Sequence, residues 1–212
     1  TGDVDALLQL LDDGAEVDQT LGDGVTPLYL ACSKGHVDAA RLLLDKGAAV
    51  DRASRNGRTP LFIACKDGHA DAARLLLERG ADVHRNDSHN SRPLHLASYY
   101  GHIEIVKLLL DSGAIADLNV TDKDGDTPMA NAEHRGHSSI IALLKKQLDL
   151  KFPLHAAART GNVEAMTQLL DGGAEVDAKN GATPLFVACE HGHVDAARLL
   201  LDKGEDVNRA RK

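Results

Sequence analysis

Histidine is the side chain of this sequence with the clearest potential for metal chemistry. Eleven of the 212 residues are histidines. Five of them directly follow a glycine: His36, His69, His102, His137 and His193. Metal ligands lie about 2 Å from a zinc ion, and histidines at equivalent places of successive repeats are too far apart to share one. Two closer pairs, His134 with His137 and His191 with His193, have no third ligand nearby. We therefore predict no metal site and no cofactor.

Cysteine and serine give no stronger case for catalysis. Cys32, Cys65 and Cys189 each lie five residues after a proline, and equivalent positions of stacked repeats exceed the Cα separation of about 7 Å that a disulfide allows. No base lies nearby to activate any of the thiols, so we expect three reduced, buried cysteines in an intracellular protein. The sequence has no serine-elbow motif, no glycine-rich phosphate loop before a helix, and no His-Glu-x-x-His motif. We predict no catalytic residues and no enzymatic activity.

Proline marks the elements that position these residues. All six prolines stand second in related triplets: Thr26-Pro27-Leu28, Thr59-Pro60-Leu61, Arg92-Pro93-Leu94, Thr127-Pro128-Met129, Phe152-Pro153-Leu154 and Thr183-Pro184-Leu185. Successive prolines are 33, 33, 35, 25 and 31 residues apart. Self-similarity at such a period is the signature of a stacked-repeat architecture.

Each repeat is predicted to hold two short helices. In the unit that begins at Thr59, this threonine and Pro60 are the residue types of a helix N-cap and first turn. Gly68 is placed to end the first helix. A second helix is predicted over residues 70–78, with Gly80 ending it. Neither helix is long enough to be stable alone, so the units must stack to share a core.

The repeat strings resemble a known family. The sequences TPLFIACKDGH at 59–69 and AARLLLERGADV at 72–83 are similar to ankyrin repeats, and the resemblance covers nearly the whole chain. It implies an all-α helical solenoid of helix-turn-helix units with projecting β-hairpin loops. It also implies that the histidines after glycine are structural and bond to the backbone of a neighbouring loop. In this family, the loop tips and the first helices line a concave groove that binds proteins.

The interval of 25 residues marks a junction between two sets of repeats. Residues 145–152 lack the Gly-Ala pair and the loop of other units, and the unit before them is polar at Asn131, Ser138 and Ser139. We predict an ankyrin array over 1–148, made of a half repeat and four repeats of which the last is cap-like. Further repeats over 149–212 either continue this stack, which we favour, or start a second array. Residues 1–6 match 160–165, so the chain begins inside a repeat.

The predicted partner-binding residues are those that vary while the framework repeats. They comprise the residue pairs that end first helices and residues of the loop tips: Arg55, Arg58, Lys66, Ser88, His89, Tyr99, Tyr100, Lys123, His134, Arg135, Glu190 and His191. Tyr99 lies four residues after His95, which places both on one helical face, and tyrosine is enriched among interface hot spots. Arginines precede Tyr99 and aspartates follow it, which favours a partner with an acidic segment followed by an apolar anchor.

We interpret the chain as a protein–protein interaction module or scaffold that is monomeric and located in the cytoplasm or nucleus. Its net charge of −8 disfavours a nucleic-acid partner, and no apolar run approaches the roughly 20 residues of a membrane span. Two alternatives stay open. Residues 35–47 and 192–204 are identical, which is typical of an artificial or recombined array without an evolved partner. The chain could also be a regulatory segment of a larger enzyme or channel.

Overall fold

The computed structural model describes residues 4–176 and 182–205. These ranges contain thirteen α-helices, one short 3-10 helix and no β-strand. They form two compact units, one ending at Ala142 and the other beginning at Leu143. The predicted all-α repeat solenoid is confirmed. The match between residues 1–6 and 160–165 rests partly on residues 1–3, which lie outside the described residues.

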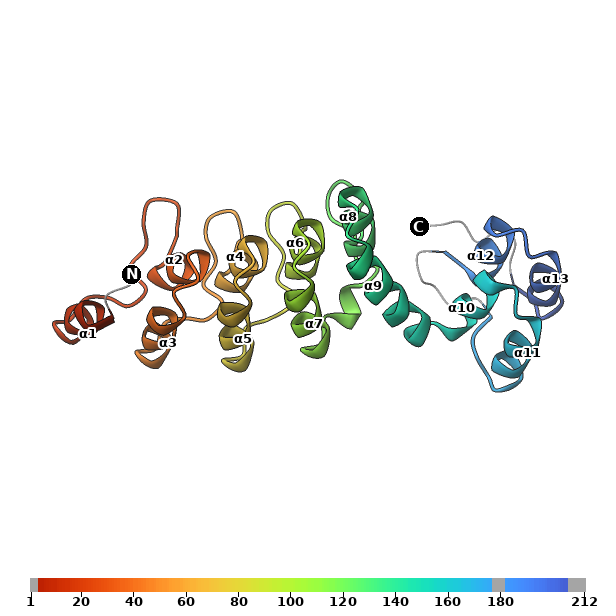
Figure 1. The fold of residues 1–212 in the computed structure, drawn as a ribbon, viewed down its shortest axis with the longest axis horizontal. Helices are drawn as coiled ribbons and strands as arrows, with labels where there is room; N and C mark the ends of the chain where they lie inside the picture. The colour runs from red at the N-terminus through yellow and green to blue at the C-terminus, as the bar shows by residue number, and fades with distance from the viewer. Residues whose placement is uncertain (1–3, 177–181, 206–212) are drawn as a thin grey trace. The chain divides into compact units, whose positions relative to one another are not determined.

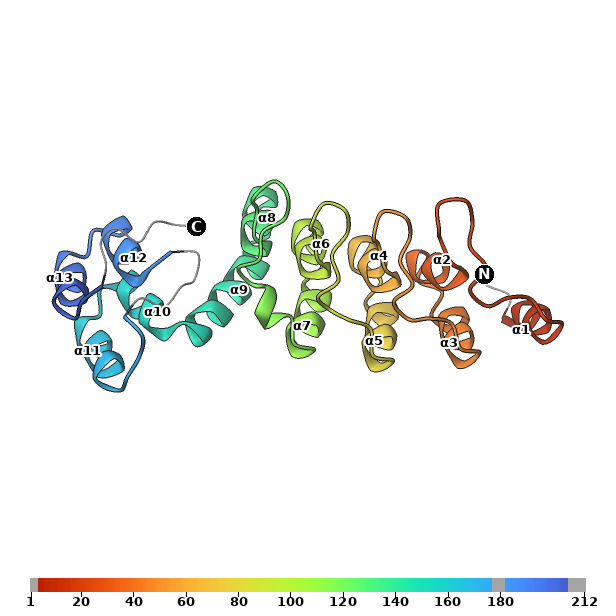
Figure 2. The same cartoon turned by 180° about the vertical axis from the view of Figure 1, so that it is seen from behind.

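Unit 1 is a row of helix pairs (Figure 1). Its first helices are α2 (Pro27–Ser33), α4 (Pro60–Asp67), α6 (Pro93–Tyr100) and α8 (Pro128–Arg135). Its second helices are α1 (Val4–Asp12), α3 (Val37–Asp45), α5 (Ala70–Glu78) and α7 (Ile103–Asp111), followed by a 3-10 turn, η1 (Ala114–Asp117). Viewed from behind, the first helices still lie side by side in one layer and the second helices in another (Figure 2).

The threonine and proline of the triplets start the first helices as predicted. Thr59 Oγ1 accepts a hydrogen bond of 3.1 Å from the Phe62 N–H, and Pro60 is the first helical residue. Because proline has no N–H, it costs nothing at a position where that group lacks a helical partner. Gly68 ends α4 in a left-handed conformation at φ +83°. Thr26, Thr127 and Thr183 cap their helices in the same way.

Helix α6 has Arg92 where α2, α4, α8 and α12 have the capping threonine, and the ring of His95 bonds to the backbone N–H of this N-cap residue instead. The Arg92 N–H donates to Nδ1 of His95 at 3.2 Å. Nε2 of the same ring donates to the Val120 carbonyl at 2.9 Å. Burial of the ring lowers the pKa of His95, which agrees with a neutral imidazole that both accepts and donates. The start of α6 is therefore tied to the following loop through one neutral side chain.

Four of the five Gly-His pairs, those of His69, His102, His137 and His193, are structural, as the resemblance implied. His69 donates from Nε2 to the Ser33 carbonyl at 3.0 Å, and His102 donates to the Lys66 carbonyl at 3.1 Å. Each ring also packs on the glycine that ends the preceding first helix. A Cβ on Gly68 would lie 2.6 Å from Cε1 of His102. His137 and His193 repeat this arrangement on the carbonyls of Tyr99 and Arg159.

Leucine and alanine form the shared core of unit 1. Leu61, Leu76 and Leu94 are each fully buried, and α4 packs directly on both α2 and α6. Burial also raises the pKa of the Cys32 thiol to about 12 and raises that of Cys65. The expectation that all three cysteines are buried is wrong for Cys189, which is exposed. It lies on α12, and no further helix pair follows α12 and α13 in the described chain.

The loops before α2, α4, α6 and α8 are closed by tight turns. In the loop before α4, the Ser54 N–H donates to the Arg58 carbonyl at 3.0 Å and the Gly57 N–H donates to the Ser54 carbonyl at 2.9 Å. Two bonds of this kind close a turn without extending into a ladder, so no strand forms in the described residues. The projecting loops were predicted correctly, and in the described residues turn bonds of this kind close them.

Unit 2 repeats the helix pair twice. Its helices are α10 (Pro153–Thr160), α11 (Val163–Asp171), α12 (Pro184–Glu190) and α13 (Val194–Asp202). Its hydrophobic core includes Leu154, Met166, Leu185 and Leu200. Helix α9 (Ser138–Lys151) contains the division between the units and runs without a break to the residue before Phe152. Whether residues 149–212 continue the first array or start a second one stays a prediction.

Candidate functional site

The ends of the first helices of unit 1 form a row of side chains on a fixed backbone. This helix-end row consists of residues 33–34, 66–67, 99–100 and 134–135. Each pair is followed by a left-handed glycine. The carbonyls of Ser33, Lys66 and Tyr99 also accept the histidine bonds described above. The framework therefore fixes the backbone of the row and leaves its side chains free to differ from unit to unit.

In the first half of the row, the contacts of Asp67 offset the charge of Lys66. The Ser33 hydroxyl donates to Oδ2 of Asp67 at 3.0 Å, and Nζ of Lys66 lies 3.6 Å from Oδ1 of the same carboxylate. Lys34 is exposed and makes no ion pair within the described chain. The charge of Lys66 is thus partly cancelled, whereas that of Lys34 remains open to a partner.

The second half of the row is aromatic and basic. The rings of Tyr99 and Tyr100 meet edge to face with centroids 5.0 Å apart. Cζ of Arg135 lies 4.8 Å from the centre of the Tyr99 ring, within cation–π range. The Tyr100 ring stacks at 6.3 Å on that of His102, and 42% of Tyr100 is exposed. His134 lies 3.4 Å from Asp126. The two tyrosines are therefore held in place by neighbouring rings while Tyr100 still faces solvent.

Backbone hydrogen bonds join the loop tips along unit 1. The Arg55 N–H donates to the Asp23 carbonyl at 2.9 Å. One loop further on, the Ser88 N–H donates to the Asn56 carbonyl at 2.9 Å, and then the Lys123 N–H donates to the His89 carbonyl at 2.9 Å. The predicted residues Arg55, Ser88, His89 and Lys123 therefore belong to one continuous edge.

Arg58 has a structural contact that sequence patterns did not indicate. Its Nε lies 3.4 Å from Oδ2 of the buried Asp87, and its Cζ lies 5.8 Å from the centre of the Phe62 ring. Asp87 also accepts the His89 N–H at 2.8 Å, and the ring of that histidine lies 3.5 Å from the same carboxylate. Arg58 and His89 thus connect adjacent loops through the carboxylate of Asp87.

Two groups of unit 1 were not predicted from the sequence. Tyr29 takes the position that Phe62 has in the next unit; burial raises its pKa, Arg58 lowers it, and Asp67 and Asp23 raise it. The fully buried Asp117 forms an ion pair with Arg92 and lies 2.9 Å from Nδ1 of His84. Tyr29 could have been found from its alignment with Phe62, but the pairing of Asp117 had no repeating counterpart.

Two of the predicted residues belong to unit 2. Glu190 and His191 are exposed at the end of α12. Nδ1 of His191 bonds to the Val187 carbonyl at 3.0 Å, and its ring stacks on His193 at 6.4 Å. They occupy in unit 2 the place that the row residues occupy in unit 1.

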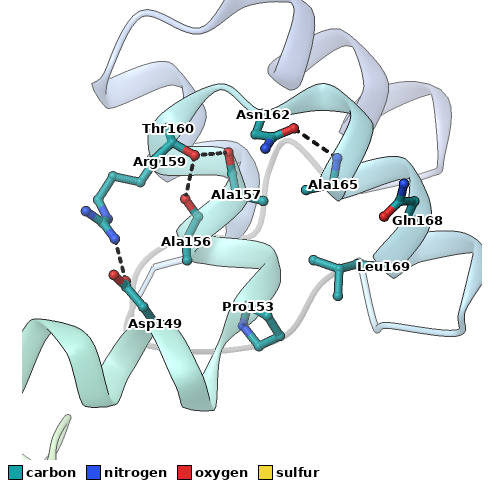
Figure 3. A pocket seen from close by; sticks show the side chains of 10 residues that line it. All are labelled: Asp149, Pro153, Ala156, Ala157, Arg159, Thr160, Asn162, Ala165, Gln168 and Leu169. Atoms are coloured by element: carbon teal, nitrogen blue, oxygen red, sulfur yellow. Dashed lines mark hydrogen bonds and ion pairs between the residues drawn. The ribbon is translucent and has the colours of Figure 1, made fainter.

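Unit 2 also has a hollow beside α10 and α11 (Figure 3). Its lining comprises Asp149, Pro153, Ala156, Ala157, Arg159, Thr160, Asn162, Ala165, Gln168 and Leu169. Asp149 is paired with Arg159, the Thr160 hydroxyl donates to the Ala156 carbonyl at 3.1 Å, and Asn162 Oδ1 accepts the Ala165 N–H at 3.0 Å. These polar groups are engaged by the fold, and no nucleophile with an adjacent base occurs among the lining residues.

The described ranges contain neither a metal-ligand cluster nor a helix suited to span a membrane. Within residues 4–176 and 182–205, no three His, Cys, Asp or Glu side chains are grouped so as to hold a metal ion. No helix in the part of the chain that the structure describes has the length and apolar character needed to cross a bilayer.

Tandem helix pairs with projecting turns define a helical repeat protein. A family model described as ankyrin repeats (3 copies) matches residues 1–87 and 143–211, and a second, described as ankyrin repeats (many copies), matches residues 76–132. The chain belongs to the ankyrin repeat family. No curated protein sequence matches it. Ankyrin repeats are generally protein–protein interaction modules and typically non-catalytic.

Proposed function

We propose that this chain holds a protein partner against the helix-end row and the joined loop tips of unit 1. The observation that carries the proposal is the contrast between backbone and side chains along the row. The same glycine and histidine contacts hold the backbone in successive units, yet the side chains are Ser-Lys, Lys-Asp, Tyr-Tyr and His-Arg. A framework that repeats while one face varies is suited to specific recognition.

Tyr99 and Tyr100 are the proposed anchor. Tyrosine contributes a large contact area with few rotatable bonds, and it is common among residues that dominate binding energy. The contact of Arg135 with the Tyr99 ring and the stacking of Tyr100 on His102 restrict both rings before a partner arrives. Less side-chain entropy is then lost on binding.

Charge at the edges of the surface is proposed to guide association. Arg55 and Lys34 are exposed and make no ion pair within the described residues. Rim charges of this kind change the association rate more than the final affinity. We propose a monomeric, non-catalytic module that acts inside the cell, where buried thiols such as Cys32 and Cys65 stay reduced.

Site-specific photo-cross-linking tests the proposal. A photoreactive amino acid replaces Tyr100 in one variant and Lys107, an exposed residue of second helix α7, in a matched control. We expect a partner to cross-link from position 100 and not from position 107. Cross-linking from position 107 alone would place the partner on the other helix layer and contradict the proposal. A lack of any partner at both positions favours an artificial or recombined array.

A further inference from the structure

The helix-end row has a regular spacing that follows from helix packing. Helices α2, α4, α6 and α8 pack side by side in unit 1 (Figure 1). Packed helices lie about 8–10 Å apart between their axes, so equivalent positions of the row recur at about that interval. A partner segment that runs along the row therefore contacts one residue pair of the row at each first helix, and we call each such helix end a step.

In one backbone conformation, the distance between successive residues on the same face equals this interval. A polyproline II helix has three residues per turn and rises about 3.1 Å per residue, so every third residue faces the same way about 9.3 Å further on. In a β-strand, residues on one face recur about every 6.6 Å. In an α-helix they recur about every 5.4 Å. Both intervals are shorter than the step of the row.

The four steps of the row differ in chemistry. The α2 step offers the exposed cation of Lys34. The α4 step is neutralised by the contacts of Lys66 and Asp67. The α6 step is the edge-to-face pair of tyrosine rings, and the α8 step offers the Arg135 guanidinium beside Tyr99. Aromatic-lined surfaces are what polyproline II segments use for docking.

From this spacing and chemistry we infer that the partner segment is an acidic polyproline II stretch. Every third residue of the segment contacts the row, and from α2 to α8 these residues are a carboxylate, a neutral side chain, an apolar side chain and a carboxylate. The inference rests on the proposed function, since it specifies the occupant of the same surface. The net charge of −8 does not oppose it, because charges further than about 8 Å away are largely screened at physiological ionic strength. Lys34 and Arg135 lie within contact distance of the inferred carboxylates.

Two labelled peptides, Glu-Pro-Pro-Gln-Pro-Pro-Leu-Pro-Pro-Glu and the same order reversed, are the probes because the row does not define the direction of the segment. The controls move each glutamate by one position at constant composition. We expect one in-register peptide to bind at least ten times more tightly than its control. Tyr99→Ala should weaken the binding of that peptide by roughly 30-fold, the scale of an interface hot spot. Lys34→Gln or Arg135→Gln should weaken its binding by up to about 5-fold. Lys107→Gln should leave binding unchanged, and circular dichroism verifies the helicity of each variant.

Two contrary results separate this inference from the proposed function. The inference is wrong if in-register and shifted peptides bind equally, while the partner that cross-links at position 100 is still lost in Tyr99→Ala. The proposed function is then retained with a different occupant. Both are wrong if neither the peptides nor the cross-linked partner respond to Tyr99→Ala.

Discussion

Replacing Gly68 with alanine tests the bridge between a histidine and the end of the preceding first helix. Gly68 has φ +83°, a left-handed conformation that costs an L-residue roughly 1–2 kcal/mol. The added methyl carbon would also lie 2.6 Å from Cε1 of His102. Displacing that ring breaks its bond to the Lys66 carbonyl, and a buried polar group left unpaired costs about 1–3 kcal/mol. We expect a total loss of roughly 2–5 kcal/mol in the free energy of unfolding.

Gly80 provides a matched control on the same helix pair. Its φ is also +83°, but no atom lies within 4 Å of a Cβ built there. Gly80→Ala should therefore cost only the backbone strain, roughly 1–2 kcal/mol. In a His102→Ala background the clash is absent, so Gly68→Ala should cost no more than the control, and the two changes should be non-additive. Urea titrations of the four variants measure these differences. Equal losses for Gly68→Ala and Gly80→Ala in the parent protein would refute the reasoning.

Three further predictions concern stability. Leu76→Ala should cost roughly 2–5 kcal/mol in urea unfolding, because this fully buried side chain would leave a cavity; a loss below about 1 kcal/mol would contradict the packing. Thr59→Ala should cost about 1 kcal/mol through its lost cap, and an unchanged unfolding midpoint would argue against the Oγ1 bond. Burial lowers the pKa of His95 from its usual 6.5, so the unfolded chain binds more protons in mild acid. The contribution of His95 to stability is fully present above about pH 6.5. It is lost as the pH falls through the pKa that His95 has in the folded protein. The pH dependence of unfolding should shrink in His95→Phe, and identical pH profiles would contradict the neutral-ring contact.

The repeating features were predictable from the sequence because each is local. The cap at Thr59 and the stop at Gly68 depend on residue types within one helix. The predicted second helix over 70–78 coincides with α5. The role of the Gly-His pairs came from the resemblance, and the structure supplies its reason in the bond from each ring to the preceding helix end.

The contacts that were missed join side chains across units without repeating. Arg58 and Asp87 are 29 residues apart, and Arg92 and Asp117 are 25 residues apart. No equivalent pair occurs in the other units of the described chain, so periodicity could not reveal them. The exposure of Cys189 was missed for a related reason. Cys189 shares Thr-Pro-Leu-Phe and Ala-Cys with the unit of the buried Cys65, but no helix pair follows its own unit in the described residues.

Titration of the partner captured at position 100 tests the central claim most directly. The dissociation constant is measured for the parent protein, for Tyr99→Ala, and for Lys107→Ala as the control on the second-helix layer. The account predicts a loss of roughly 30-fold for Tyr99→Ala, parent-like binding for Lys107→Ala, and unchanged helicity in both. Parent-like binding by Tyr99→Ala together with a large loss in Lys107→Ala would contradict it.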